Sequence, residues 1–235
     1  FDVTAYYRTT TPGSLHIYTR IISELEDIFT SMGFQLAEGP EVETEFYNFD
    51  ALNIPDSHPA RDMFDTIWIQ DSPGTLLRTH TSPIQIHAMQ SFGAPVAVFA
   101  HGRVYRHEAT DATHDFMFSQ IEGLLVDKNI SIAHLLATTR TFLSALFDKK
   151  NIDIRVRPSF FPFVEPALEI DIACPFCSSG CSICKKSGFI ELMGGGLVHP
   201  HVLKSGGIDP DNYSGFAFGF GLERLAMIRY GIRDI

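Results

Sequence analysis

Two segments that should form neighbouring strands carry the side chains best suited to bind a ligand. The first strand ends at Arg106. The second places a ring, an amide and a carboxylate on one face, because side chains alternate along a strand; these are Phe118, Gln120 and Glu122. A ring can stack on a base, an arginine can bind phosphate, and the two polar groups can accept hydrogen bonds from an ammonium group. These residues indicate a ligand site, and the alternative is a solvated hairpin with a ladder of ion pairs.

The segment 214–224, SGFAFGFGLER, has a second pattern that suits a ligand site. Phenylalanines alternate with small residues, so one strand face is packed with rings and the other is almost free of side chains. Glycine often occurs in a strand where a ligand or another backbone approaches closely. The face of small residues is called the cleared face below. The helix that follows brings Arg224 beside it, which favours a ligand over the alternative of close packing between sheet and helix.

All 4 cysteines lie in one short stretch, CPFCSSGCSIC, as Cys174, Cys177, Cys181 and Cys184. Disulfides between such close neighbours would close very small loops, so a disulfide framework is disfavoured. The two Cys-x-x-Cys pairs could supply four thiolates to one tetrahedral Zn²⁺ ion. Reduced, unligated thiols are the alternative, and both interpretations fit a reducing compartment.

The composition is that of a globular protein, with 45% hydrophobic and 20% charged residues in a chain of 235. No apolar run is long enough to span a bilayer and no signal peptide is visible, so we expect a cytoplasmic protein without membrane contact. The formal net charge of −10 gives no electrostatic footprint for nucleic acid. Because the chain begins with Phe1 rather than Met, we expect it to be a piece of a longer one.

Hydrophobic periodicity predicts a single α+β domain over residues 1–235, with a mostly antiparallel sheet flanked by helices. Amphipathic helices are expected between Ser14 as N-cap and Gly33, after Pro83, from Ser131 onward, and at 222–231. A strand interrupted by Gly39-Pro40 is expected at 33–43. Further strands are expected at 66–69, 96–106, 117–126, 152–166, 167–174 and 214–221, and near 189–193 before a glycine-rich turn. The cysteines form an insertion at about 174–188.

Several motifs in chain order resemble the class II aminoacyl-tRNA synthetases. GFQLAEGPEVE, with Pro40, resembles motif 1, GRVYRHE…FMFSQIEG resembles motif 2, and GFAFGFGLERLAM resembles motif 3. The branch resembled is the catalytic α subunit of bacterial-type phenylalanyl-tRNA synthetase. Its further marks are FYNFDALNIP, HPARDM, LLRTHTSPIQ, TDATHDFMFSQIEG, FPFVEP and GIDPDNYSGFAFGFGLERLAM, which cover nearly the whole chain.

The resemblance implies an ATP site built from motifs 2 and 3. Arg106 would bind the α-phosphate, and in the motif 2 loop His114 would contact phosphate and Glu108 the adenine. Phe118 would stack on one face of the adenine. Arg224 would cover the other face and reach the γ-phosphate, so that Arg106, Arg224 and His114 form the catalytic set.

The resemblance also implies a phenylalanine site. The amino and carboxylate groups would be held by His80, Ser82, Gln120 and Glu122. The side chain would meet Phe161 and Phe163 edge to face. The bottom and wall of its pocket would be shaped by Val164, Ala217 and Gly219.

The implied reaction is activation of phenylalanine to phenylalanyl-adenylate, followed by transfer to tRNA(Phe). Glu165 matches a glutamate that would bind Mg²⁺ shared with a β subunit, in a heterotetramer of two α and two β chains. The tRNA-binding helical arm that begins the family's α subunit is absent, and the cysteine cluster occurs in only some members.

Two other functions remain open at this stage. A synthetase-like protein could bind phenylalanine or ATP without catalysing a reaction, but it would be expected to lose Arg106 or Arg224 first, and both are present. A zinc-binding interaction module would explain the cysteines and leave the other motifs unexplained.

Overall fold

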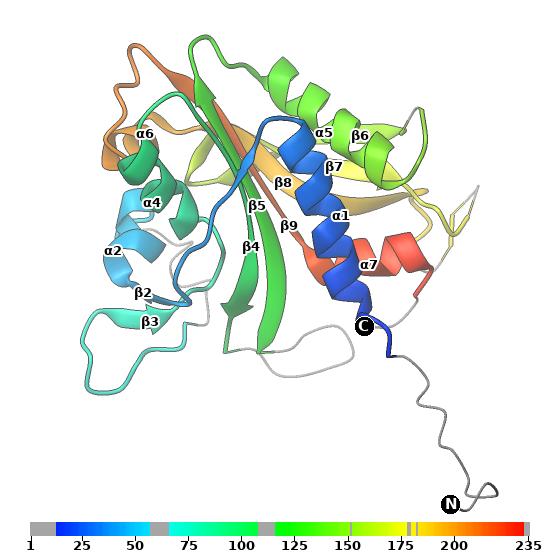
Figure 1. Ribbon diagram of the computed structural model, residues 1–235, viewed down its shortest axis with the longest axis horizontal. Helices are drawn as coiled ribbons and strands as arrows, with labels where there is room; N and C mark the ends of the chain where they lie inside the picture. Colours follow the sequence, from blue (N-terminus) through cyan, green and yellow to red (C-terminus); the bar gives the residue numbers. More distant parts are fainter. Residues whose placement is uncertain are drawn as a thin grey trace, which may run out of the picture.

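Seven strands form the central sheet, in the order β1-β4-β5-β9-β8-β7-β6 (Figure 1). The computed structural model describes residues 13–56, 66–107, 116–150, 152–177, 180–181 and 183–232. The strands span Gln35–Leu36 (β1), Val96–Tyr105 (β4), Met117–Asp127 (β5), Ile154–Phe161 (β6), Val164–Ala173 (β7), Phe189–Val198 (β8) and Ser214–Gly221 (β9). The short β1 pairs in parallel with β4, and the other neighbours in this sheet are antiparallel. The predicted α+β class with a mostly antiparallel sheet is therefore confirmed.

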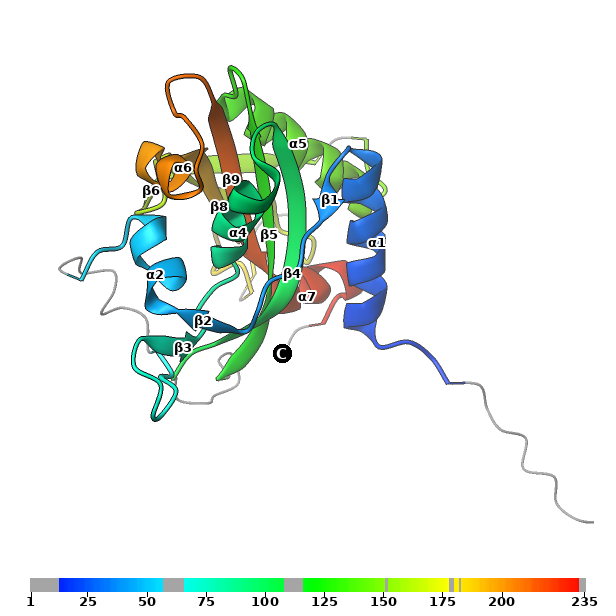
Figure 2. The ribbon, with the colours of Figure 1, turned by 60° about the vertical axis from the view of Figure 1, so that its left-hand side comes forward.

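Helices cover both faces of the sheet, as Figure 2 shows. On one side lie α1 (Ile17–Ser31) and α5 (Ile132–Leu146), with α7 (Leu222–Tyr230) below them. On the other side lie α2 (Glu45–Asn48), the 3₁₀ helix η1 (Asp50–Leu52), α4 (Pro83–Phe92) and α6 (Pro200–Ser205). A small antiparallel pair of strands, β2 (Val42–Thr44) and β3 (Thr75–Leu77), stands beside α2.

Phenylalanine rings fill the core between the sheet and α1 and α5. The ring centroid of Phe218 in β9 lies 5.8 Å from that of Phe29 in α1, and Phe220 lies 5.7 Å from Phe142 in α5. Each buried ring removes about 150–250 Å² from water, so this face supplies much of the fold's stability. The alternation predicted from the sequence is thus confirmed on this side, and the cleared face of β9 is left to the opposite layer.

Two local expectations are wrong. The first helix begins at Ile17 and is capped by His16, whose Nδ1 accepts the Tyr18 amide at 3.2 Å, so Ser14 is not its N-cap. The expected glycine-rich turn is not a turn, because Gly194–Gly196 lie within β8. Side chains there would collide: a Cβ on the last of these glycines would stand 2.3 Å from the Pro166 carbonyl oxygen.

The strand expected at 66–69 is also not found, because this segment makes only a single bridge, between Trp68 and Leu76. The insertion expected at about 174–188 is the connection between β7 and β8. Among the described residues, no helix is both long and apolar enough to cross a membrane.

Candidate active site

The segment before α4 is tied to β5 by side-chain hydrogen bonds. The Thr81 amide donates to Gln120 Oε1 at 3.2 Å, and its hydroxyl donates to Glu122 Oε2 at 3.0 Å. Gln85, in the first turn of α4, donates through Nε2 to the other oxygen of the same carboxylate. Ser82 is the N-cap residue of that helix. The sheet and helix therefore fix both oxygens of a buried carboxylate.

Burial dominates the electrostatics of Glu122, which is 6% exposed. Loss of hydration raises its pKa to about 7, against the lowering effect of hydrogen bonds from Gln85, Thr81 and Ser82. The carboxyl group is thus balanced between its two protonation states near neutral pH. A cation placed beside it would favour the charged form.

An imidazole and two rings lie beside this carboxylate segment. His80 is buried, and burial together with the nearby charge of Arg106 lowers its pKa to about 3, so it is neutral. Its ring centroid is 6.2 Å from that of Phe163, which in turn lies 5.9 Å from Phe161. The three residues form an uncharged, largely aromatic surface.

Glycines on the middle strands make room for these rings. A Cβ on Gly194 would stand 2.8 Å from the Phe161 ring, and one on Gly219 would stand 3.0 Å from Glu122 Oε2. Gly219 pairs with both Gly194 and Glu122 in the sheet register. The cleared face of β9 therefore lies under the aromatic pair and the carboxylate.

Val164 and Ala217 belong to the hydrophobic cluster against which these rings pack. Ala217 is 2% exposed and Val164 is 3% exposed, and Phe161 and Phe163 are partly buried against their cluster. The structure thus brings together the residues that the sequence assigns to phenylalanine: His80, Ser82, Gln120, Glu122, Phe161, Phe163, Val164, Ala217 and Gly219.

Arg106 and Phe118 meet at the end of the β4–β5 hairpin. The Arg106 guanidinium carbon is 5.0 Å from the Phe118 ring centroid, and its Nε donates to the Thr79 carbonyl at 3.2 Å. The backbone that carries His80 therefore also orients this arginine. A planar cation beside a ring is the pairing expected for a phosphate and an adjoining base.

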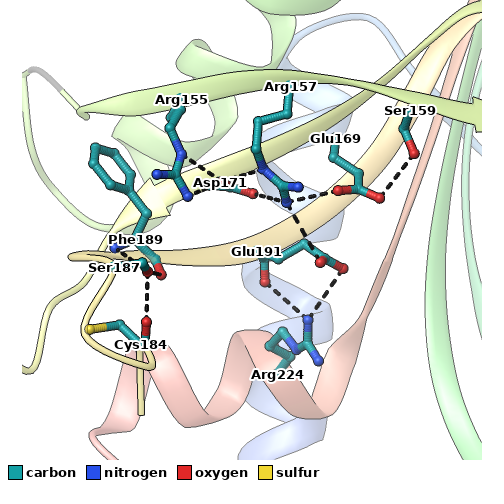
Figure 3. Close-up of polar contacts among 10 residues, drawn as sticks. All are labelled: Arg155, Arg157, Ser159, Glu169, Asp171, Cys184, Ser187, Phe189, Glu191 and Arg224. Atoms are coloured by element: carbon teal, nitrogen blue, oxygen red, sulfur yellow. Dashed lines mark hydrogen bonds and ion pairs between the residues drawn. The ribbon is translucent and has the colours of Figure 1, made fainter. Parts of the chain in front are cut away.

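Arg224 points to β8 (Figure 3). Its Nη1 donates to the Glu191 carbonyl oxygen at 3.2 Å and lies 3.5 Å from Glu191 Oε1. The preceding residue, Glu223, accepts the Ser119 amide at 2.8 Å, which ties the start of α7 to the strand of Phe118. The two sides of the expected adenine site are therefore linked through the Glu223 side chain, while Arg224 itself engages Glu191.

Glu165 stands apart, at the start of β7. It is 77% exposed, and its Oε2 lies 3.7 Å from His199 Nε2. Glu108 and His114, which the sequence assigns to adenine and phosphate, lie outside the described residues.

The four cysteine sulfurs converge on one point. All of them lie within 4.8 Å of one another, and the four thiols are free. This donor set, four soft thiolates, is the one that Zn²⁺ prefers in structural sites.

Sequence reasoning missed three polar residues of the site. Thr81 and Gln85 bind the Glu122 carboxylate, and Glu191 binds Arg224. A signal existed for Gln85, since a residue three positions after the N-cap Ser82 lies in the first turn of the helix, on the same side as Ser82. Nothing local indicated Glu191, because its partner is 33 residues away.

Comparison with known proteins defines the class. The whole chain, residues 1–235, matches the family model described as tRNA synthetases class II core domain (F). The pyrrolysyl-tRNA synthetase of Desulfitobacterium hafniense has a similar fold, with a TM-score of 0.66 over 91% of this chain and 70% of that one. At 20% identity this likeness concerns the fold alone.

Closer relatives define the branch. The chain is 52% identical to the phenylalanine–tRNA ligase alpha subunits of Exiguobacterium sp. and Ectopseudomonas mendocina, over 100% of its length and 68% of theirs. Identity to the same subunit of Leptospira biflexa is 55%, over 95% of this chain and 65% of that protein. The chain therefore belongs to the class II tRNA synthetases and, within them, to the family of phenylalanine–tRNA ligase alpha subunits.

Proposed function

We propose that this chain is the catalytic part of an enzyme that activates L-phenylalanine with ATP and transfers it to tRNA(Phe). The observation that carries the proposal is the buried Glu122 carboxylate, fixed by Thr81 and Gln85 beside the Phe161–Phe163 pair. An acceptor for an ammonium group next to an aromatic surface suits a free aromatic amino acid.

The amino-acid site would hold phenylalanine at both ends. The ammonium group would be bound by Glu122 and Gln120, and binding would draw the Glu122 carboxyl toward its charged form. Neutral His80 and Ser82 would contact the carboxylate without adding charge. The rings of Phe161 and Phe163 would receive the side chain, over a floor of Val164, Ala217 and Gly219.

The chemical step would need no protein nucleophile. The phenylalanine carboxylate attacks the α-phosphorus of ATP, the bond to the bridging oxygen breaks, and pyrophosphate leaves. Arg106 would stabilise the negative charge that grows on the α-phosphate, and His114 and Arg224 would bind the phosphates that leave. Phe118 would stack on the adenine, with Glu108 binding its edge. In transfer, a tRNA hydroxyl attacks the carbonyl of the adenylate and releases AMP.

Two metals belong to the proposal. Enzymes of this class use ATP with Mg²⁺, which neutralises phosphate charge when bound. The exposed carboxylate of Glu165 offers the oxygen ligand that Mg²⁺ prefers, and as a single ligand it suits a site completed by a β subunit. We assign Zn²⁺ to Cys174, Cys177, Cys181 and Cys184. The assembly would hold two α and two β chains in the cytoplasm.

The alternative, a catalytically silent phenylalanine- or ATP-binding protein, keeps no specific support. Both arginines expected to act on phosphate are present, and Arg106 is oriented by the backbone that carries His80. The test is ATP–pyrophosphate exchange by the full α subunit with its β partner. Phenylalanine-dependent exchange is expected, whereas ligand binding without exchange would favour the silent protein.

A further inference from the structure

The four cysteines lie in the loop that closes the β7–β8 hairpin. The last residue of β7, Ala173, pairs with the first residue of β8, Phe189. Just beyond that pair, the Cys174 amide donates to the Gly188 carbonyl at 2.8 Å. The loop therefore continues the hairpin, and its conformation determines how the first residues of β8 are presented.

The spacing of the sulfurs fits one tetrahedral ion. The Sγ–Sγ distances are 3.8 Å for Cys174–Cys181, 3.6 Å for Cys177–Cys184 and 3.7 Å for Cys181–Cys184. With Zn–S bonds of about 2.3 Å, the ligands of a tetrahedral site stand about 3.8 Å apart. The Cys181 amide also donates to Cys184 Sγ at 3.1 Å, a contact that stabilises a thiolate.

The backbone of the cysteine loop has an unusual conformation that a bound metal would stabilise. Lys185 and Lys186 are both left-handed, with φ of 50° and 64°, and Gly180 has φ of 107°. Two successive non-glycine residues in this region are unusual, because their side chains crowd the backbone. Among the described residues of 174–188 only Cys174 and Cys184 are buried, and a metal bound by four side chains would hold the loop in this shape.

Ser187 connects the loop to β8 (Figure 3). Its hydroxyl lies 2.6 Å from the Cys184 carbonyl oxygen and 2.7 Å from that of Phe189, so it donates to either one. It also accepts the Phe189 amide at 3.2 Å. The Phe189 ring is covered by Arg155, whose guanidinium carbon is 4.4 Å from the ring centroid.

From Arg155 a row of alternating charges runs across three neighbouring strands: Arg155 and Arg157 lie on β6, Asp171 on β7 and Glu191 on β8. The carboxylate of Asp171, which is 1% exposed, accepts two hydrogen bonds from Arg155 at 2.9 and 2.7 Å. It accepts two more from Arg157, each of 2.8 Å. Arg157 Nη2 reaches Glu191 Oε2 at 3.7 Å. Because Asp171 joins two arginines of the neighbouring strand, the row depends on the pairing of β7 with β6 as well as on its pairing with β8.

The row ends on Arg224. Glu191 stands two residues after Phe189 on β8 and binds Arg224 through both its carbonyl and its carboxylate (Figure 3). Arg157 and Arg224 thus share Glu191, one at each carboxylate oxygen. The position of an arginine assigned to ATP is therefore set from the hairpin that the cysteine loop closes.

We infer that the four-cysteine loop binds Zn²⁺ as a clasp on the β7–β8 hairpin, and that the clasped hairpin positions Arg224 for ATP through Arg157 and Glu191. The metal takes no part in the chemistry. The role of Arg224 rests on the proposed function, whereas the zinc and the clasp do not.

The first measurement is metal content. The full α subunit in complex with its β subunit, purified without added metal, should contain about one zinc per α chain. The double variant Cys181→Ser, Cys184→Ser should contain none. Co²⁺ exchanged into the wild type should give the charge-transfer absorption of a thiolate site. A wild-type complex without zinc, or Co²⁺ without thiolate bands, overturns the inference.

The second measurement is hydrogen exchange in the backbone. Removal of zinc by a chelator should speed amide exchange in 164–198, while exchange in α1 and α5 stays as it was. Because the chelated sample starts from folded protein, failure of the cysteine variant to fold does not prevent the test. Unchanged exchange in 164–198 after complete loss of zinc contradicts the clasp.

The third measurement separates the row of charges from the metal. Arg157→Met should keep its zinc but raise KM for ATP up to about fivefold, the scale of one partly exposed ion pair. KM for phenylalanine should stay constant. The matched control is Arg229→Met. Arg229 lies on the same helix as Arg224 and pairs with Glu24 of α1 at 3.7 Å, so its loss should change neither KM.

These results distinguish the two failures. If the wild type binds zinc and shows the clasp but catalyses no pyrophosphate exchange, the proposed function fails and the metal site stands. If exchange is normal and Arg157→Met leaves KM for ATP unchanged, the proposed function stands and the positioning of Arg224 is refuted.

Discussion

Gly219 lies against the carboxylate of Glu122 on the neighbouring strand, and a Cβ at position 219 would stand 3.0 Å from Oε2. That separation is tight for a carbon and a carboxylate oxygen whose neighbours already fix them. Thr81 and Gln85 hold the Glu122 side chain from the other side, so it cannot easily turn away. We propose that the absence of a side chain at 219 leaves the carboxylate room to bind a ligand's ammonium group.

The substitution Gly219→Ala should weaken phenylalanine activation. Overfilling a packed site costs about 1–3 kcal/mol, which corresponds to roughly a fivefold to 150-fold loss of kcat/KM for phenylalanine. Gly221→Ala is the control, because a Cβ there meets nothing within 4 Å. Pyrophosphate exchange measured for both variants decides the matter, and equal activities would remove Gly219 from the site.

The pH dependence of phenylalanine use should follow Glu122. Its pKa is raised to about 7 by burial, and only the ionised carboxylate attracts an ammonium group strongly. We therefore expect kcat/KM for phenylalanine to rise with pH through about 7. In Glu122→Gln the rate should be lower and this rise should be absent. A rise that persists in the variant would assign the titration to another group.

The free energy of unfolding should also depend on pH through Glu122, but it should fall as pH rises, whereas phenylalanine activation should increase. The folded-state pKa of about 7 lies above the ordinary glutamate pKa of 4.5, so the folded protein binds the proton more tightly than the unfolded chain does. This contribution is fully present below pH 4.5 and is lost as pH rises through 7. Glu122→Gln mimics the protonated acid, so it should melt at a higher temperature than the wild type at pH 8, with a smaller difference at pH 5. A difference that does not change with pH would contradict the raised pKa.

Removal of Arg106 should abolish adenylate formation without unfolding the protein. An arginine that stabilises transition-state charge contributes about 3 kcal/mol or more, which is at least a hundredfold in rate. Arg103 lies in β4, three residues before Arg106; Arg103→Ala removes an exposed arginine bound to Glu41 and serves as the control. Near-normal pyrophosphate exchange in Arg106→Ala would exclude this arginine from the mechanism.

The substitution Ala217→Gly should widen the amino-acid pocket. Loss of the methyl group is expected to admit para-chlorophenylalanine, and to raise tyrosine activation less, because the hydroxyl must leave water for an apolar wall. The measurement is the ratio of exchange efficiencies for para-chlorophenylalanine and phenylalanine. If only stability falls and the ratio stays constant, Ala217 packs the core and does not line the pocket.

Strong periodicity made most of the fold predictable. The hairpin expected at 96–106 and 117–126 is observed at Val96–Tyr105 and Met117–Asp127, because alternating apolar residues fix both strands and their register. The turn predicted from the glycine-rich segment was wrong, although a run of glycines is typical of turns. In Gly194–Gly196 the glycines instead allow close approach of the Phe161 ring and the Pro166 carbonyl, which no local pattern indicates.

The candidate site was predictable in its composition and less so in its contacts. Alternation along β5 correctly placed Gln120 and Glu122 on one face, and the motifs supplied His80 and the phenylalanine pair. The pairing of Arg224 with Glu191 depends on how α7 packs beside β8, and sequence distance conceals it. The raised pKa of Glu122 likewise follows from burial, which only the fold determines.

Amino-acid-dependent ATP–pyrophosphate exchange tests the central claim most directly. The full α subunit, with and without its β partner, is assayed with each standard amino acid in turn. Phenylalanine should support strong exchange in the complex, tyrosine should support about a hundredfold less, and the remaining amino acids should give background rates. Exchange with another amino acid in preference to phenylalanine, or none at all in a folded complex that binds phenylalanine and ATP, would contradict the proposed function.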